Sequence, residues 1–252
     1  MSLRLILGLC LALCAPLPAS AQDCVAPPYS APSGSALDRL LSRALPVIAG
    51  YPSLQRALQA EGPTICLAAD IGVAMGYYEP STNTVMVDAA LNADLQVVIL
   101  AHEIRHVEQF GRGICPHDGL SMREYARATW AIEADAMTIT LIVAWALREG
   151  GAPGPWQALA DLPRYADMTS AFAAGMADHG DLFTASEAAF TLWYENESRR
   201  QDYYIASCSA YLDRLDATHA LPRYETLRDD FFDQLCVLPD GTPFSCDEPA
   251  LP

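Results

Sequence analysis

Two histidines four residues apart enclose a glutamate: His102, Glu103 and His106. Residues i and i+4 of a helix lie on one face, so both imidazoles can bind a single metal ion. Glu103 lies about 100° round the helix axis from His102, which puts its carboxylate beside the metal rather than on it. From the residue counts, chance gives roughly 0.005 such HExxH motifs in this chain. The spacing predicts a metal site with a general base next to it, in preference to an ordinary amphipathic helix with hydrogen-bonded histidines.

A catalytic zinc ion takes three protein ligands and keeps its fourth position open. The strongest third candidate is Glu133, which interrupts an apolar helical stretch that has almost no basic residue near it. A buried carboxylate is costly unless it is paired or coordinated, and binding a metal would remove that cost. Asp135 is the alternative. It lies about 200° from Glu133 on a helix, so one of the two faces the metal and the other is free to hold a histidine N–H. His117, in the loop after the motif, is a weaker third option.

The elements around these residues predict a mixed α+β fold. Three short runs rich in β-branched residues, separated by turn residues, predict a small antiparallel sheet: 64–69, 73–78 and 84–88. The apolar surface of 97–107 predicts a mostly buried helix carrying both histidines. A second helix is predicted over 122–148, carrying Glu133. Its most apolar part, 139–147, is too short to cross a membrane and reads as a core helix.

Apolar residues at helical spacing indicate further helices at 36–48, 52–60, 156–161, 164–177, 185–215 and 224–236. The tyrosines of the longest of these segments, Tyr194, Tyr203, Tyr204 and Tyr211, are expected to be core residues. We expect four parts: a signal peptide at 1–21, a Pro- and Ser-rich segment at 22–35, a catalytic core at 36–150 and a helical C-terminal subdomain at 151–252.

The first residues predict export. A short basic start (1–4), an apolar run (5–15) and the small residues Ala19-Ser20-Ala21 are typical of a secretory signal peptide. The chain has 15 basic and 31 acidic residues, a net charge of −16, and no lysine. This acidic field disfavours nucleic acid and anionic membrane surfaces as partners. We expect the protein to act in the periplasm or outside a bacterial cell.

Six of the eight cysteines lie beyond the predicted signal peptide: Cys24, Cys66, Cys115, Cys208, Cys236 and Cys246. An even number of cysteines in an exported chain predicts three disulfides. Cys236 and Cys246 form the most local pair, because the turn sequence Pro239-Asp240-Gly241 between them brings them together. The other two pairings stay open.

The motif and the segment that follows it resemble a known class of enzyme. His102-Glu103-Ile104-Arg105-His106, completed by Gln109 and followed by a Glu-Ala-Asp-Ala helix from Glu133, resembles zincin metallopeptidases with a glutamate third ligand, the gluzincin type. It is similar to bacterial metallopeptidase families whose active helix reads HELRHxxQ. The resemblance covers residues 64–145. One position departs from it: several gluzincins carry an aspartate four residues after the ligand glutamate, where this chain has Met137.

The resemblance implies a zincin-like α+β fold and zinc-dependent hydrolysis of peptide bonds. It implies zinc bound by His102, His106 and Glu133, with Glu103 as the general base. It also implies that extended substrate pairs with an edge strand of the sheet. Met137 leaves the choice between Glu133 and Asp135 open.

We therefore expect an exported zinc metallopeptidase acting on a peptide or protein substrate. Glu103 would take a proton from the water that zinc activates and pass it to the leaving amine. A non-catalytic, disulfide-braced binding or structural protein that keeps zinc as a staple is the alternative. Hydrolysis of a non-peptide amide or ester would use the same chemistry. Glu103 favours an enzyme, because structural zinc usually closes its fourth position with Cys or His.

Overall fold

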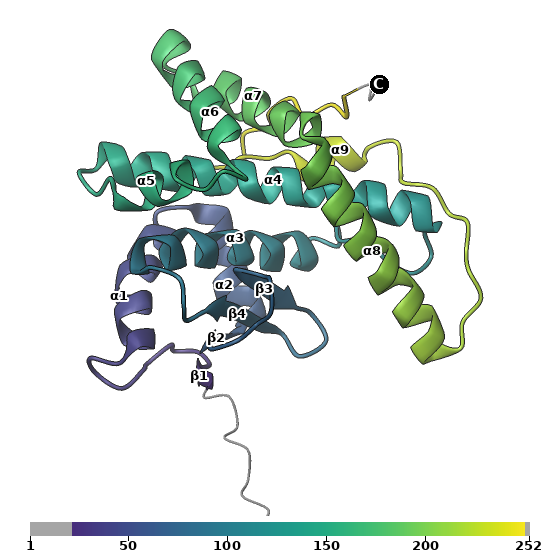
Figure 1. Cartoon of the computed structure of the whole chain (residues 1–252), viewed down its shortest axis with the longest axis horizontal. Helices are drawn as coiled ribbons and strands as arrows, with labels where there is room; N and C mark the ends of the chain where they lie inside the picture. The colour runs from purple at the N-terminus through teal and green to yellow at the C-terminus, as the bar shows by residue number, and fades with distance from the viewer. Residues whose placement is uncertain (1–21, 250–252) are drawn as a thin grey trace, which may run out of the picture.

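The structure, a computed structural model, describes residues 22–249, so the predicted signal peptide lies outside the described residues. It confirms the α+β fold (Figure 1). The strands are β1 (Gln22–Val25), β2 (Thr64–Ala68), β3 (Gly76–Glu79) and β4 (Thr84–Asp88). The helices are α1 (Ala36–Ala49), α2 (Pro52–Glu61), α3 (Ala93–Gly111), α4 (Met122–Glu149), α5 (Gly154–Ala160), α6 (Ala166–His179), α7 (Leu182–Glu195), α8 (Glu197–Thr218) and α9 (Phe231–Leu235).

The sheet is mixed, where the sequence predicted an antiparallel one. Its strand order is β1-β2-β4-β3, and the central pair β2–β4 is parallel. The reason is that β3 does not pair with β2, which precedes it in the chain. It crosses to the far edge, and β4 turns back between β2 and β3, antiparallel to β3. β1, which was not predicted, adds an antiparallel strand to the other side of β2.

Helix α3 lies between the sheet and α4, in contact with both (Figure 1). It starts at Asn92, whose side chain accepts hydrogen bonds from the backbone N–H groups of Asp94 and Leu95. From Leu95 to Gln109 nearly every residue is buried, as expected for a helix covered on both faces. The two motif histidines therefore sit in the centre of the protein.

Helix α4 is the predicted buried helix. Ser121 caps it by accepting from the N–H of Glu124, and α3, α5, α7 and α8 pack around it. Among the described residues it is the helix long and apolar enough to cross a membrane, but 72% of that apolar window is buried inside the protein. Its apolar surface is thus used as protein core.

The C-terminal part is helical, with two departures from the predicted elements. The segment 185–215 is two helices, α7 and α8, because Asn196 is extended and caps α8 by accepting from the N–H of Arg199. The segment 224–236 contains one short helix, α9, and is otherwise irregular. Since α8 packs along α4, the C-terminal helices reach the helix that carries Glu133.

Residues 22–249 hold two disulfides, where three were predicted. Cys236–Cys246 forms as predicted, and Cys24 pairs with Cys66, its neighbour in register across β1 and β2. Cys115 and Cys208 are free. They lie on the loop after α3 and on α8, where neither has a cysteine partner in the part of the chain that the structure describes. An even number of cysteines does not require all of them to pair. The two disulfides indicate an oxidising environment.

We expect the oxidised chain lacking residues 1–21, unfolded without reductant, to titrate two thiols, those of Cys115 and Cys208. In the folded protein Cys115 should react slowly, because burial raises the pKa of its thiol to about 12 and leaves little thiolate. The measurement is thiol titration with and without denaturant, with Cys115→Ser as the assignment control. Finding no free thiol in the unfolded chain would mean that Cys115 and Cys208 are also oxidised, which would contradict their free state in the structure.

Candidate metal centre

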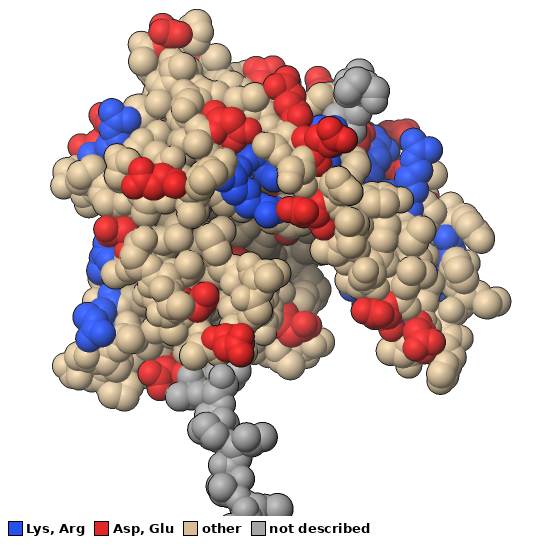
Figure 2. All heavy atoms as spheres, in the orientation of Figure 1, with Lys and Arg blue, Asp and Glu red and all other residues tan. Residues whose placement is uncertain are grey.

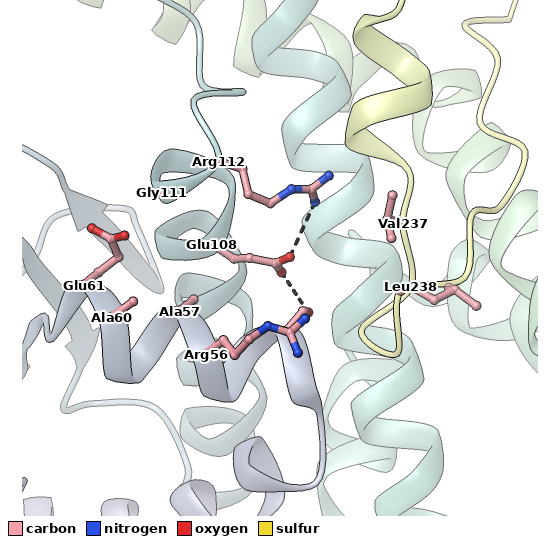
Figure 3. Close-up of a pocket in the computed structure, with 11 residues that line it drawn as sticks. Arg56, Ala57, Ala60, Glu61, Glu108, Gly111, Arg112, Val237 and Leu238 are labelled. Atoms are coloured by element: carbon pink, nitrogen blue, oxygen red, sulfur yellow. Dashed lines mark hydrogen bonds and ion pairs between the residues drawn. The ribbon is translucent and has the colours of Figure 1, made fainter.

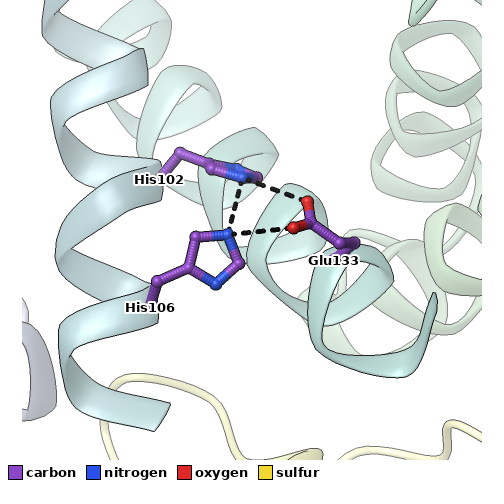
Figure 4. A group of neighbouring side chains, drawn as sticks. All are labelled: His102, His106 and Glu133. Atoms are coloured by element: carbon purple, nitrogen blue, oxygen red, sulfur yellow. Dashed lines mark hydrogen bonds and ion pairs between the residues drawn. The ribbon is translucent and has the colours of Figure 1, made fainter. Parts of the chain in front are cut away.

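Three side chains from α3 and α4 converge between the two helices (Figure 4). The Nε2 atoms of His102 and His106 lie 3.1 Å apart. Each is 3.6 Å from a different carboxylate oxygen of Glu133. These donor atoms all lie within 4.8 Å of one another, close enough to hold one metal ion.

Hydrogen bonds on the far side of each imidazole fix its protonation. The Thr140 hydroxyl donates to the carbonyl of Ala136, so its oxygen accepts from Nδ1–H of His102, 3.1 Å away. The Gln109 amide donates through Nε2, so its Oε1, 2.8 Å from Nδ1 of His106, accepts from that ring. Both Nε2 lone pairs therefore face each other and Glu133, as metal ligands require. Lone pairs this close repel, and a cation between them removes the repulsion.

Asp135 points away from the imidazoles. Its carboxylate accepts two hydrogen bonds from Arg105, Nε at 2.7 Å and Nη2 at 3.0 Å. Nε2 of Gln109 donates to Asp135 at 2.7 Å. Asp135 and Arg105 are fully buried. Arg105 of α3 thus supplies the basic partner that α4 itself lacks. Asp135 is linked to the Nδ1–H of His106 through Gln109 rather than directly.

Glu103 lies beside this group under the edge strand. It is 3% exposed, and its Oε2 has no hydrogen-bond partner among the described residues. Gly76 of β3 packs against it: a Cβ there would lie 2.9 Å from Oε1 of Glu103 and 2.6 Å from Ile99. Burial raises the pKa of Glu103 to about 8, and a positive charge nearby would counter that effect. The orphaned oxygen is aimed at no protein donor and is free to handle a proton.

Tyr203 of α8 completes the group, although its spacing predicted a core residue. Burial would raise the pKa of Glu133, but the imidazoles of His106 and His102 and a hydrogen bond from Tyr203 together lower it. The Tyr203 ring packs 5.4 Å from Trp193 and lies under the Arg164 guanidinium, also at 5.4 Å. The sequence signal that could have identified Tyr203 is that a buried tyrosine hydroxyl needs a hydrogen-bond partner.

The remaining histidines lie elsewhere. The His117 ring accepts a hydrogen bond from the N–H of Gly119 in its own loop, and His117 is not part of the metal-binding group. His179 ends α6 and His219 ends α8, and both are exposed.

Two imidazole nitrogens and one carboxylate oxygen are a ligand set that catalytic zinc takes in proteins, so these residues fit that metal. The sequence model of a family described as "Putative metallopeptidase family (DUF6782)" matches residues 18–246. The chain belongs to this family. The DUF6782 match runs from before β1 to Cys246, so it includes α8 and the C-terminal disulfide as well as the motif helix. No curated protein and no solved structure gives a significant match to the chain.

Proposed function

We propose that the protein is an exported zinc metallopeptidase of the gluzincin type, with His102, His106 and Glu133 as the metal ligands. The observation that carries the proposal is the convergence of these three donors from two helices, with each imidazole already oriented by a hydrogen bond to Nδ1. Preset donors of this kind lower the cost of ordering the site when the metal binds. Membership of a metallopeptidase family supports the same assignment.

Zinc, when bound, supplies a Lewis acid that acidifies water and polarises the substrate carbonyl. Glu103 handles the proton. Its Oε2 has no other partner among the described residues, so it accepts a proton from the attacking water and delivers it to the leaving amine. The Tyr203 hydroxyl helps to keep the pKa of Glu133 low, which favours the ionised carboxylate that a metal ligand needs. Thr140 and Gln109 keep both Nε2 atoms unprotonated and facing inward.

Strand β3 is the surface for the substrate backbone. It is an edge strand that pairs with β4 on one side, so its other side is free to add a strand. Its first residue, Gly76, touches the Glu103 carboxylate, so a peptide added there would pass next to the general base. The molecular surface is hollowed between the side that carries β3 and β4 and the arm formed by α8 (Figure 2).

The alternative is a non-catalytic scaffold with zinc as a staple. Glu103 argues against it, because burying a carboxylate with one oxygen that has no hydrogen-bond partner among the described residues costs stability and brings a structural site no benefit. An enzyme retains such a group for its chemistry.

The discriminating experiment is a broad peptide library incubated with chain lacking residues 1–21, before and after metal removal by a chelator. We expect cleavage by the zinc-loaded chain, loss of cleavage after chelation, and recovery when zinc is added back. Glu103→Gln serves as the matched inactive control. A zinc-loaded chain that cleaves no peptide would favour the scaffold.

A further inference from the structure

Arg105, the arginine within the motif, is not used by the chemistry above. Its side chain is fully buried and makes contacts in three directions. It grips both oxygens of Asp135, pairs with Glu108, and donates from Nη2 to the backbone carbonyls of Leu235 and Val237, at 3.1 and 3.0 Å. One guanidinium thus joins α3, α4 and the C-terminal segment, which lies 130 residues further along the chain.

On one side this junction leads to the metal site. Asp135 accepts from Nε2 of Gln109 at 2.7 Å, and Oε1 of the same amide lies 2.8 Å from Nδ1 of His106. Asp135 and Gln109 are fully buried, so water does not substitute for a lost partner. The order of contacts is therefore Arg105, Asp135, Gln109, His106. A shift at the first of these changes the hydrogen bond that orients the last.

On the other side it leads to a disulfide. Residues 235–246, here called the C-terminal hairpin, double back through a bridge between Val237 and Pro243 and are closed by Cys236–Cys246. The two carbonyls that Arg105 holds flank Cys236. The hairpin also meets α2 and α3 by polar contacts: the carbonyl of Pro239 accepts from the N–H of Ser53, and Arg112 donates to the carbonyl of Gln234 just before it.

Packing between the hairpin and these helices is incomplete. Figure 3 shows a pocket between α2, the end of α3 and the hairpin, with Val237 and Leu238 on one wall and Glu108 and Arg112 on another. Leu235, Leu238 and Phe244 of the hairpin are buried in the core, so apolar burial holds the hairpin together with these hydrogen bonds, and the Cys236–Cys246 disulfide adds a covalent closure at the residue between the two carbonyls.

We propose that Arg105 and the C-terminal hairpin are positioning elements of the metal site, acting on His106 through Asp135 and Gln109. The Cys236–Cys246 disulfide holds the backbone carbonyls of Leu235 and Val237 in place. These carbonyls position Arg105. Arg105 in turn positions the relay behind His106, which consists of Asp135 and Gln109. The inference rests on the proposed metal site. It implies that the chain binds zinc weakly before this disulfide forms, so peptidase activity appears in an oxidising compartment and is low before export.

The test compares two double variants, each lacking one disulfide. Cys236→Ser/Cys246→Ser removes the hairpin closure, and Cys24→Ser/Cys66→Ser removes the β1–β2 disulfide, which contacts none of the relay. Zinc affinity is measured by competition with a chromophoric chelator, and the ligand geometry by the visible spectrum of the Co²⁺ form. We expect a loss of about 10- to 100-fold in zinc affinity and a changed Co²⁺ spectrum for the hairpin variant, as removal of outer-shell partners produces. We expect less than about a 2-fold change for the control.

A double-mutant cycle separates positioning from general loosening of the fold. Gln109→Met cuts the relay between hairpin and histidine. If the hairpin acts through Gln109, combining the two changes should lower zinc affinity by no more than the larger single loss, whereas independent effects would add.

Arg105→Lys keeps the positive charge beside Asp135 but loses the planar fork, and it gives a second test if the hairpin variant fails to fold. Unchanged zinc affinity in the folded hairpin variant or in Arg105→Lys, or additive losses in the cycle, would overturn the inference. A wild-type chain with no zinc affinity would overturn the metal site as well, whereas one that binds zinc but cleaves no peptide would overturn the proposed activity alone.

Discussion

Replacing Glu103 by Gln is expected to lower peptide hydrolysis by at least about 10² to 10⁴ while leaving zinc bound, because general acid–base groups typically contribute this much to rate. The amide has nearly the same size, so the packing of this side chain next to Gly76 should persist. It cannot accept the proton from water. The measurement is kcat/KM on a library-derived substrate, with metal content determined on the same sample.

The control for this variant is binding of a peptide hydroxamate, which chelates zinc without needing the general base. Glu103→Gln should bind it at close to wild-type affinity, since the ligands are intact. Undiminished hydrolysis in this variant would refute the role of Glu103. Loss of zinc together with activity would instead make Glu103 part of the metal site.

Replacing Glu133 by Ala should remove most of the zinc, whereas Asp135→Ala should weaken zinc binding by only about 10- to 100-fold. The structure gives the reason for the difference. Glu133 places an oxygen 3.6 Å from each Nε2, while Asp135 faces Arg105 and Gln109. Chelator competition on both variants measures the two losses, and Glu133→Gln is the size-matched control for the lost charge.

Asp135→Ala carries a second expected effect, on stability. It would leave the fully buried guanidinium of Arg105 without its bidentate partner, and breaking a buried ion pair costs roughly 3–5 kcal/mol. Its thermal unfolding midpoint should therefore fall further than that of Glu133→Ala. Greater zinc loss in Asp135→Ala than in Glu133→Ala would reverse the two assignments.

Local periodicity was enough to place the central residues. The i, i+4 spacing puts His102 and His106 on one face, and the 200° between Glu133 and Asp135 on a helix allows one of them to face that group. The structure brings Glu133 to the imidazoles. That Asp135 would be paired was not predictable from α4, because its partner Arg105 belongs to a helix 30 residues earlier.

Features that depend on long-range packing could not be predicted from the sequence. The parallel pairing of β2 with β4 follows from the crossing of β3, which no local pattern records. Tyr203 has the same helical spacing as core tyrosines, and it reaches Glu133 because α8 docks along α4. Counting cysteines gave three disulfides, but Cys115 and Cys208 lie on elements that bring neither to a partner.

The most direct test of the proposed zinc site is anomalous X-ray diffraction at the zinc edge from crystals of the zinc-loaded chain lacking residues 1–21. We expect one strong anomalous peak per chain, about 2.0–2.2 Å from Nε2 of His102, Nε2 of His106 and a carboxylate oxygen of Glu133. We also expect Glu103 to lie beside the peak without binding it. A peak bound by Asp135 or His117, or no peak between α3 and α4 in crystals of zinc-loaded protein, would contradict the account.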